Sequence, residues 1–176
     1  KSANPLSFGS AGNGTTSHLA GEMFKQVTGV NWMHVPYKGG AAALTDLMAG
    51  RIDVLIDVAP NVGPHVAAGR IKALAVTTKE RVKAFDKLPT VLESGVPGYV
   101  VTAWDGLFVP ARTDAAIVSQ LTAAVLAALK NPELKAQLEA RVATPSPLSN
   151  GQFRDFIVAE TQRWAEVVKK SGASVD

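Results

Sequence analysis

The segment from Gly9 to His18, with the sequence GSAGNGTTSH, combines glycines with hydroxyl and amide side chains in a pattern suited to holding an anion. It follows an apolar run and precedes a helical pattern, so its main-chain N–H groups belong to the start of a helix. The first N–H groups of a helix have no partner within it, and they favour a nearby negative charge. A tight turn in which Thr16 or Ser17 only caps the helix is the alternative. The candidate ligand-binding residues here are Ser10, Ala11, Gly12, Asn13, Gly14, Thr15, Thr16 and His18.

This glycine pattern differs from the two nucleotide-binding motifs nearest to it. A P-loop needs a lysine at the position where Thr15 stands. The glycine order is G-x-x-G-x-G, whereas the dinucleotide fingerprint is G-x-G-x-x-G. An enzyme that uses this loop for a phosphorylated or nucleotide substrate is therefore the weaker hypothesis.

Two further loops carry polar residues directly after strand-like runs. In Tyr37-Lys38-Gly39-Gly40, Gly39 permits close approach of the backbone to a ligand and Tyr37 offers a hydroxyl. Lys38 either attracts an anion or is simply solvated. Asp57 ends the third run, where its carboxylate would repel an anion, so it either caps the following helix or receives a ligand amine. We add Tyr37, Gly39 and Asp57 to the candidate ligand-binding residues.

Catalytic and metal-binding patterns are absent from the sequence. There are no cysteines, which excludes disulfides, thiol catalysis and thiolate metal sites. The histidines, His18, His34 and His65, match no metal-ligand spacing, and we expect His34 inside a strand and His65 inside a helix. No paired carboxylates and no G-x-S-x-G nucleophile motif are present. We therefore expect no cofactor and no metal, and a binding protein rather than an enzyme.

Charge and hydropathy exclude two further classes of protein. The net charge is +3, and the densest basic cluster is the pair Lys169-Lys170, which is not the basic stripe of a nucleic-acid-binding surface. No apolar run approaches the roughly 20 residues needed to cross a membrane. No signal-peptide pattern is present, so an exported form would already have lost it. With 176 residues and 47% hydrophobic content, the chain is long enough for one substantial core.

Short apolar runs alternate with helical segments up to residue 78, and glycines mark the helix ends. This alternation predicts βαβ units and a mainly parallel sheet, an α/β fold. Right-handed crossovers place the strand-to-helix loops at the carboxyl edge of such a sheet. The loops 10–16, 37–40, 57–61 and 77–78 should therefore meet there. The expected strands are 6–10, 31–37, 54–57 and 71–77, and the expected helices are 17–28, 41–49 and a short one that stops at Gly69.

The pattern changes after residue 78. Residues 79–92 are charged and partly helical in pattern, 93–99 form a turn-rich connection, and 100–109 are β-prone. At the other end of the chain, Lys1–Pro5 is typical of a helix end that runs into a turn.

Three helices are expected after residue 110. The first starts near Thr113 or Asp114, the second has Asn131 as N-cap before a proline, and the third opens with a capping box from Ser149 to Gln152. Their apolar faces have no strand repeats beside them. We expect them to pack on a sheet from a segment outside this chain, with a separate helical domain as the alternative. The apolar positions are Val118, Leu121, Val125, Leu129, Phe153, Phe156, Ile157, Trp164, Val167 and Val168.

Seven segments, taken in order, resemble the Bug-type receptors of tripartite tricarboxylate transporters. No single segment is specific to these receptors, but seven in this order are, and they cover nearly the whole chain. They are GSAGNGTTSHLAGEMF, HVPYKGG, DLMAGRIDVLID, AAGRIKALAVTTKER, LPTVLESGVPGY, AWDGLFVPA and SPLSNGQFRDFIVAETQRWAEVVKKSG.

The resemblance implies an extracytoplasmic solute-binding protein with a two-lobed, periplasmic binding protein-like (type II) fold that closes on its ligand about a hinge. Such receptors hold a carboxylate with main-chain amides and hydroxyls from one loop of each lobe, and their second-lobe loop maps to residues 10–16. Residues 1–103 would be that second lobe. Residues 104–176 would be a crossover strand and helices returning to the first lobe, whose N-terminal part is absent here.

The same resemblance implies a location and partners. The location is the periplasm. The partners are a small organic acid or amino acid as ligand and the permease subunits of the transporter in the membrane, with no nucleic acid. A ligand-sensing module that uses the same clamp is a further alternative.

Overall fold

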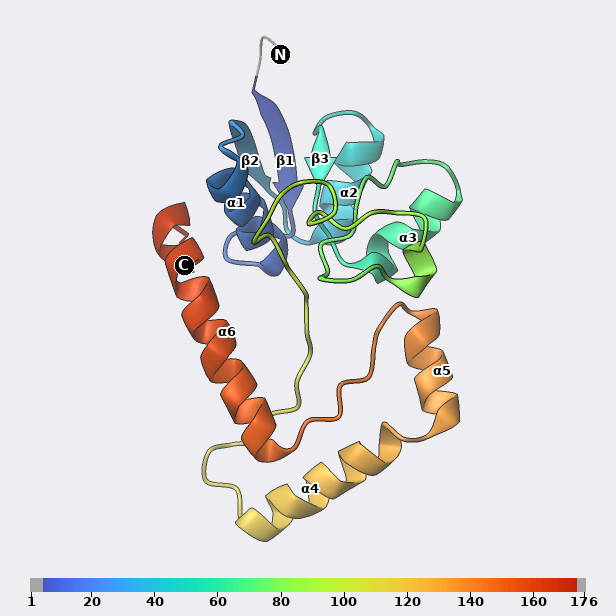
Figure 1. Cartoon of the computed structure of the whole chain (residues 1–176), viewed down its shortest axis with the longest axis vertical. Helices are drawn as coiled ribbons and strands as arrows, with labels where there is room; N and C mark the ends of the chain where they lie inside the picture. The colour runs from blue at the N-terminus through green and yellow to red at the C-terminus, as the bar shows by residue number, and fades with distance from the viewer. Residues whose placement is uncertain (1–4, 174–176) are drawn as a thin grey trace. The chain divides into compact units, whose positions relative to one another are not determined.

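A three-stranded parallel sheet organises the first part of the chain (Figure 1). The strand β1 (Leu6–Ser10) lies between β2 (Trp32–Pro36) and β3 (Val54–Leu55), and both neighbours run parallel to it. The helices α1 (Thr16–Thr28), α2 (Gly40–Met48) and α3 (Ala59–Ala67) each follow one strand. The predicted alternation is therefore confirmed up to α3. This computed structural model describes residues 5–173, so the helix end predicted at residues 1–4 lies outside the described residues.

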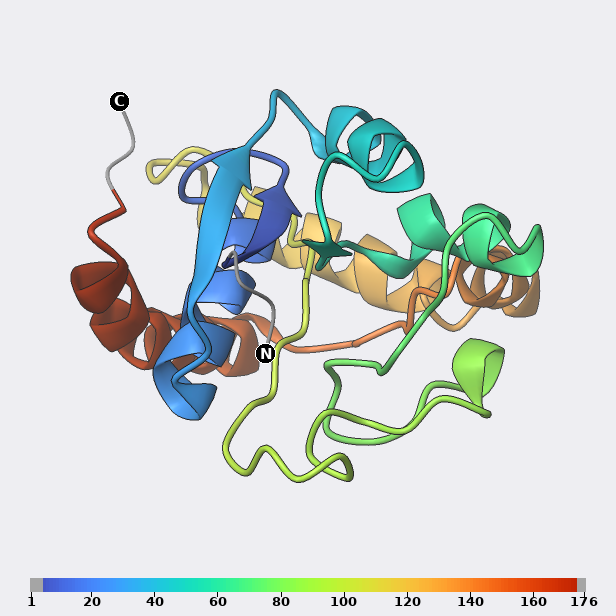
Figure 2. The ribbon, with the colours of Figure 1, turned by 90° about the horizontal axis from the view of Figure 1, so that it is seen from above.

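The two faces of the sheet are covered by different helices, α1 on one and α2 on the other (Figures 1 and 2). Phe8 of β1 is fully buried, and its ring lies 4.9 Å from that of Trp32 in β2. On that face Gly21 brings α1 so close to β1 that a Cβ at residue 21 would overlap the Phe8 ring. Gly9, the next residue of β1, faces α2 instead. A Cβ placed on Gly9 would lie 3.5 Å from the Cβ of Ala43 in α2.

Two predicted strands do not form. Residues 71–77 and 100–109 contain no strand, and the parallel pairing in this region is a single bridge between Val76 and Thr90. The two runs still meet at one point, where the N–H of Val101 donates to the carbonyl of Thr77 over 2.8 Å. A strand needs a partner along its length, and β-prone composition does not supply one.

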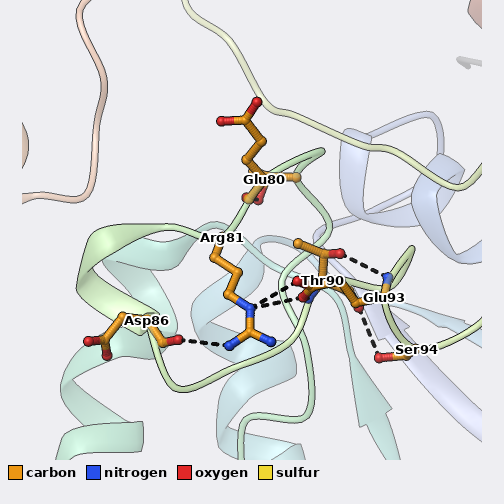
Figure 3. Close-up of polar contacts among 7 residues, drawn as sticks. Glu80, Arg81, Asp86, Thr90, Glu93 and Ser94 are labelled. Carbon is orange, nitrogen blue, oxygen red and sulfur yellow. Dashed lines mark hydrogen bonds and ion pairs between the residues drawn. The ribbon is translucent and has the colours of Figure 1, made fainter.

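The turn-rich segment after residue 78 is ordered by side-chain hydrogen bonds rather than by a sheet (Figure 3). The Nε of Arg81 lies 3.0 and 3.1 Å from the two carboxylate oxygens of Glu93. Thr90 and Glu93 cap one another, since each side chain accepts the N–H of the other residue. These hydrogen bonds from Thr90 and Arg81 hold the pKa of Glu93 below its usual value. The predicted partial helix in this region is the short 3-10 turn η1 (Lys83–Phe85).

The chain divides into two compact units, one made of residues up to Ala103 together with those from Ala165, and one made of Trp104–Trp164. The second unit holds α4 (Ala115–Ala128), α5 (Pro132–Ala140) and most of α6 (Asn150–Ser171). The last turns of α6 belong to the first unit, where the side-chain amide of Gln26 donates to the carbonyl of Val167 over 3.4 Å.

The three helix starts predicted after residue 110 are confirmed. Asp114 caps α4 by accepting the N–H of Ala116, and Asn131 caps α5. At the start of α6, the N–H of Ser149 donates to the side chain of Gln152 and the hydroxyl of Ser149 accepts the N–H of Gln152. This reciprocal pair is the predicted capping box.

Within the described residues the apolar faces of α4 and α5 are not buried, whereas Val167 of α6, one of the predicted apolar positions, is buried. None of the residues of α4 and α5 is buried, and Leu121 keeps 47% of its surface exposed. The rings of Trp104, Phe108, Phe153 and Phe156 cluster with centroids 5.2 to 6.4 Å apart, but Phe108 is 66% exposed. An apolar helix face is buried only where another element covers it, and within residues 104–164 no element does so.

Candidate functional site

The loops that follow β1, β2 and β3 meet at one edge of the sheet, as the crossover rule predicts. The N–H of Tyr37 donates to the carbonyl of Ser10 and that of Gly39 to Ala11, each over 3.1 Å. Gly12 has φ of 132°, and a Cβ there would lie 3.1 Å from the carbonyl oxygen of Tyr37, so glycine is needed at this crossing. The fourth predicted contributor, Thr77, pairs instead with Val101.

Four main-chain N–H groups of the first loop are used inside the loop. That of Ala11 donates to the hydroxyl of Ser17 over 2.9 Å, and that of Gly12 to the hydroxyl of Ser10 over 3.1 Å. The N–H of Gly14 donates to Nδ1 of His18 over 3.1 Å, and that of Thr15 to the carbonyl of Gly12 over 3.3 Å. The sequence prediction had all these backbone groups facing an anion, and for these four the structure differs.

Three other N–H groups remain open at the start of α1. Within the described chain, the N–H groups of Asn13, Thr16 and Ser17 have no hydrogen-bond partner. Thr15 caps the helix with its hydroxyl, which accepts the N–H of His18 over 3.4 Å, and the first turn contains no acidic residue. Asn13 and Thr16 are exposed. Within the described residues, the start of α1 therefore has unpaired N–H groups at two exposed residues, Asn13 and Thr16, and at Ser17, which is buried.

Tyr37 uses its hydroxyl inside the fold. The hydroxyl donates to a carboxylate oxygen of Asp46 over 2.9 Å, and Arg51 binds the other oxygen of Asp46 over 2.8 Å. Burial, followed by the bond to Asp46, raises the pKa of Tyr37. The hydrogen bonds from Arg51 and Tyr37 lower the pKa of Asp46. In this structure the hydroxyl predicted for a ligand is used to fix the loop to α2.

Asp57 is engaged within its own loop and lies over the start of α2. One carboxylate oxygen accepts the N–H of Val58 over 2.8 Å, and the other accepts the side-chain amide of Asn61 over 3.2 Å. A Cβ on Gly40, the first residue of α2, would lie 2.5 Å from Asp57 Oδ2. Gly39 offers α2 no side-chain cap, and the carboxylate of Asp57 places a negative charge of the protein itself beside this helix start.

Sequence reasoning expected His34 inside a strand, which the structure confirms, but did not count it as a site residue, and its side chain lies against the first loop. Its ring stacks on that of His18 with centroids 3.9 Å apart and planes 13° apart, and its Nε2 lies 2.6 Å from the hydroxyl oxygen of Ser10. Burial lowers the pKa of His18 and, with the neighbouring charges of His18 and Lys25, lowers that of His34 to about 4. Strand alternation carries the missing signal, because His34 points to the same face as Trp32 and pairs in register with Phe8.

A hollow of about 250 Å³ lies beside this histidine pair. It is lined by Asn13, His18, Glu22, His34 and the end of α6 at Ser171, Gly172 and Ala173. Across residues 5–173, no three His, Asp or Glu side chains are grouped so as to hold a metal ion. In the same part of the chain, none of the helices has the length and apolar character to span a membrane.

The chain matches one protein family. The model of the tripartite tricarboxylate transporter family receptors, TctC, matches residues 1–173. Among curated relatives, a UPF0065 protein in the tcbD-tcbE intergenic region of Pseudomonas sp. strain P51 is 36% identical over 93% of this chain and 49% of its own length. Protein BugT of Bordetella pertussis is 35% identical over 92% of this chain and 50% of its own length. The chain thus spans about half the length of these curated relatives.

Three solved structures share the fold. Rpa4515 of R. palustris, solved with adipate, has a TM-score of 0.89 and 38% identity over 97% of this chain and 58% of its own. The periplasmic binding protein BugD has a TM-score of 0.82 and 32% identity over 96% of this chain and 57% of its own. MatC (Rpa3494) of Rhodopseudomonas palustris, with bound malate, has a TM-score of 0.82 and 31% identity over 93% of this chain and 56% of its own.

Proposed function

The chain belongs to the TctC family of tripartite tricarboxylate transporter receptors, and from this premise we propose that it captures one carboxylate of a small organic acid at the start of α1. The remaining part of the same ligand would be held by a segment outside this chain. The protein would deliver its ligand unchanged.

The observation that carries the proposal is the set of open donors at Asn13, Thr16 and Ser17. Thr16 and Ser17 are the first two residues of a 13-residue helix that has no acidic residue in its first turn, and Asn13 lies two residues before its N-cap. Unpaired N–H groups together with the positive end of the helix dipole favour a carboxylate oxygen over a neutral group. Two similar proteins were solved with the dicarboxylates adipate and malate, which supports an organic acid as the ligand class.

The remaining parts of the assignment rest on the family. Residues 1–103 would form the second lobe of a type II binding protein, and 104–176 would return to the first lobe. The exposed apolar faces of α4 and α5 support this, because they need a cover that this chain does not contain within its described residues. The protein would act in the periplasm and pass its ligand to permease subunits in the membrane. A small amino acid is a second ligand class, and a sensing role with the same clamp is the alternative to transport.

The expected affinity of this chain is weak. A hydrogen bond to a charged group contributes about 1.5 to 3 kcal/mol, and micromolar binding requires about 8 kcal/mol. Three such donors at the lower end of this range contribute about 4.5 kcal/mol before the loss of the ligand's freedom is counted, so about millimolar or weaker dissociation is expected.

An amide-resolved NMR titration with adipate tests the proposal at these concentrations. We expect saturable shifts at the N–H groups of Asn13, Thr16 and Ser17, and smaller shifts at Ala11 and Gly12, whose N–H groups are already bonded. Adipamide, which has the same chain length without charge, is the control. Shifts of equal size with adipamide, or tight binding dominated by residues outside this loop, would contradict the proposal.

The same sample separates a receptor from an enzyme. The adipate signals should be unchanged after prolonged incubation, because a receptor releases its ligand without chemical change. Formation of any product would favour the alternative of an enzyme acting through the glycine-rich loop.

A further inference from the structure

Three aromatic rings form a column behind the first loop. Phe8 of β1 stacks on His34 of β2 with centroids 4.9 Å apart, and His34 stacks on His18 of α1 at 3.9 Å. The column lies on the sheet face that α1 covers, and His18 keeps only 5% of its surface exposed. Neither imidazole touches the open donors directly. Both reach residues that shape the loop around those donors.

His18 holds the loop through a bond that requires a neutral ring. The N–H of Gly14 donates to Nδ1 of His18 over 3.1 Å, so Nδ1 must present a lone pair. Protonation of His18 would place an N–H against the N–H of Gly14 and end this bond. Gly14 has φ of 73°, one of several conformations open to glycine, and the bond to His18 helps to select it.

His34 holds the other side of the loop through Ser10. Its Nε2 lies 2.6 Å from the hydroxyl oxygen of Ser10, and this oxygen also accepts the N–H of Gly12 over 3.1 Å. Gly12 and Gly14 flank Asn13, whose N–H is open. The two histidines therefore fix the residues on both sides of one ligand donor.

We propose that His18 and His34 are positioning residues that keep the loop in its anion-accepting shape only while His18 is neutral, so that acid releases the bound carboxylate. The inference rests on the proposed function for the ligand, but the coupling of the loop to His18 is a property of the chain alone.

The surroundings of the pair favour its neutral form. Burial is the main cause that lowers the pKa of both rings, and the charge of Lys25 acts in the same direction. Glu22 acts in the opposite direction on His18. The end of α6 adds Ser171, Gly172 and Ala173 to the adjoining hollow, none of which titrates. Two stacked imidazolium rings would also repel one another.

The proposal predicts that affinity for a carboxylate falls in acid, whereas simple electrostatics predicts that it rises. A positive imidazolium near the site would attract a carboxylate more strongly, so charge alone predicts tighter binding in acid. Loss of the Gly14 bond predicts weaker binding. The pH dependence of affinity therefore separates a positioning role from a direct charge contact.

Amide substitutions at the two histidines provide a matched test. Asparagine places its oxygen near the position of Nδ1, and glutamine places its amide near Nε2, and neither can be protonated in this range. We expect His18→Asn to bind adipate about tenfold more tightly than His18→Gln, because only the former can accept the N–H of Gly14. At residue 34 the order should reverse, with His34→Gln about tenfold better than His34→Asn. The same order at both positions, or equal affinities, would overturn the proposal.

The unsubstituted chain supplies a second test that needs no variant and no ligand. As the pH falls, the amide signal of Gly14 should follow the ring titration of His18, whose pKa burial holds below the usual imidazole value, and His18→Asn should abolish this change. Adipate itself takes up protons in acid, and this changes the measured affinity of both chains. The ratio of the two affinities at each pH removes that common effect. Tighter binding of the unsubstituted chain in acid relative to His18→Asn would overturn the proposal.

These measurements distinguish the two proposals. If adipate binds but the Gly14 signal is independent of His18, the positioning role is wrong and the proposed function stands. If Gly14 follows His18 but adipate shifts no amide of the loop, the proposed function is wrong and the coupling stands.

Discussion

The starts of α1 and α2 occupy equivalent places in the fold but present different charges to the edge of the sheet. Each helix follows a parallel strand and a glycine-containing loop. α1 is capped by the neutral hydroxyl of Thr15, which leaves the N–H groups of Thr16 and Ser17 open, whereas the carboxylate of Asp57 stands over Gly40 at the start of α2. The glycine-rich turn alone therefore does not define an anion site. The charge of the group that faces the helix start decides whether an anion can bind there.

The largest effect is expected from removing one open donor of α1. Proline is tolerated at the first position of a helix, and Thr15 before it already has the extended conformation that precedes proline, with φ of −72° and ψ of 160°. Thr16→Pro should therefore keep α1 and remove its first N–H. A hydrogen bond to a carboxylate contributes about 1.5 to 3 kcal/mol, so adipate binding should weaken about 10- to 100-fold in the NMR titration.

Thr16→Ala is the matched control, because it removes the hydroxyl and keeps the N–H. The difference between the two variants isolates the main-chain donor. Equal losses in both would show that the hydroxyl, and not the start of the helix, holds the anion.

A smaller effect of opposite sign is expected from opening α2. Asp57→Asn removes the negative charge beside Gly40 and retains a polar side chain of the same shape. A charge at a helix end contributes about 0.3 to 1 kcal/mol, so adipate should bind about 2- to 5-fold more tightly. Asp86→Asn, at an exposed carboxylate after η1, makes the same change in net charge and should have a smaller effect. Equal gains in adipate affinity in both variants would show that net charge, and not the position of Asp57 beside α2, causes the effect.

The smallest effect on binding is expected at α5, whose start is closed by its own cap. Asn131 accepts the N–H groups of both Glu133 and Leu134, at 2.8 and 3.3 Å. Asn131→Ala should destabilise the chain by about 0.5 to 2 kcal/mol in urea unfolding and leave adipate affinity unchanged. A change in affinity larger than twofold would mean that α5 contributes to the site.

The parts of the fold that sequence predicts best are those with local causes. Helix starts at Asp114, Asn131 and Ser149 follow from side chains within three residues of the amides they cap, and all three are present. Strands depend on distant partners. The run 71–77 has the composition of a strand but forms only a bridge at Val76 and a contact of Thr77 with Val101, because composition does not specify what lies beside it.

In the candidate site too, some features were predictable from the sequence and others were not. Convergence of the loops follows from crossover handedness and was predictable. The direction of each N–H was not, because it depends on hydroxyl and imidazole acceptors, such as Ser17 for Ala11 and His18 for Gly14. His34 was within reach of prediction, since register with β1 places it opposite Phe8, and Ser10 lies two residues further along β1 on the same face.

The contact between Gly21 and Phe8 leaves no clearance between α1 and the strand beneath it. A helix packed this closely on the strand has little room to shift, so we expect its unpaired amides to keep their positions when an anion binds. Binding then costs little conformational entropy in the protein, so the few hydrogen bonds to the anion keep most of their contribution to the free energy of binding. Gly21, which has no side chain and lies on the face of α1 that packs on the sheet, thus affects how well the start of the helix can bind an anion.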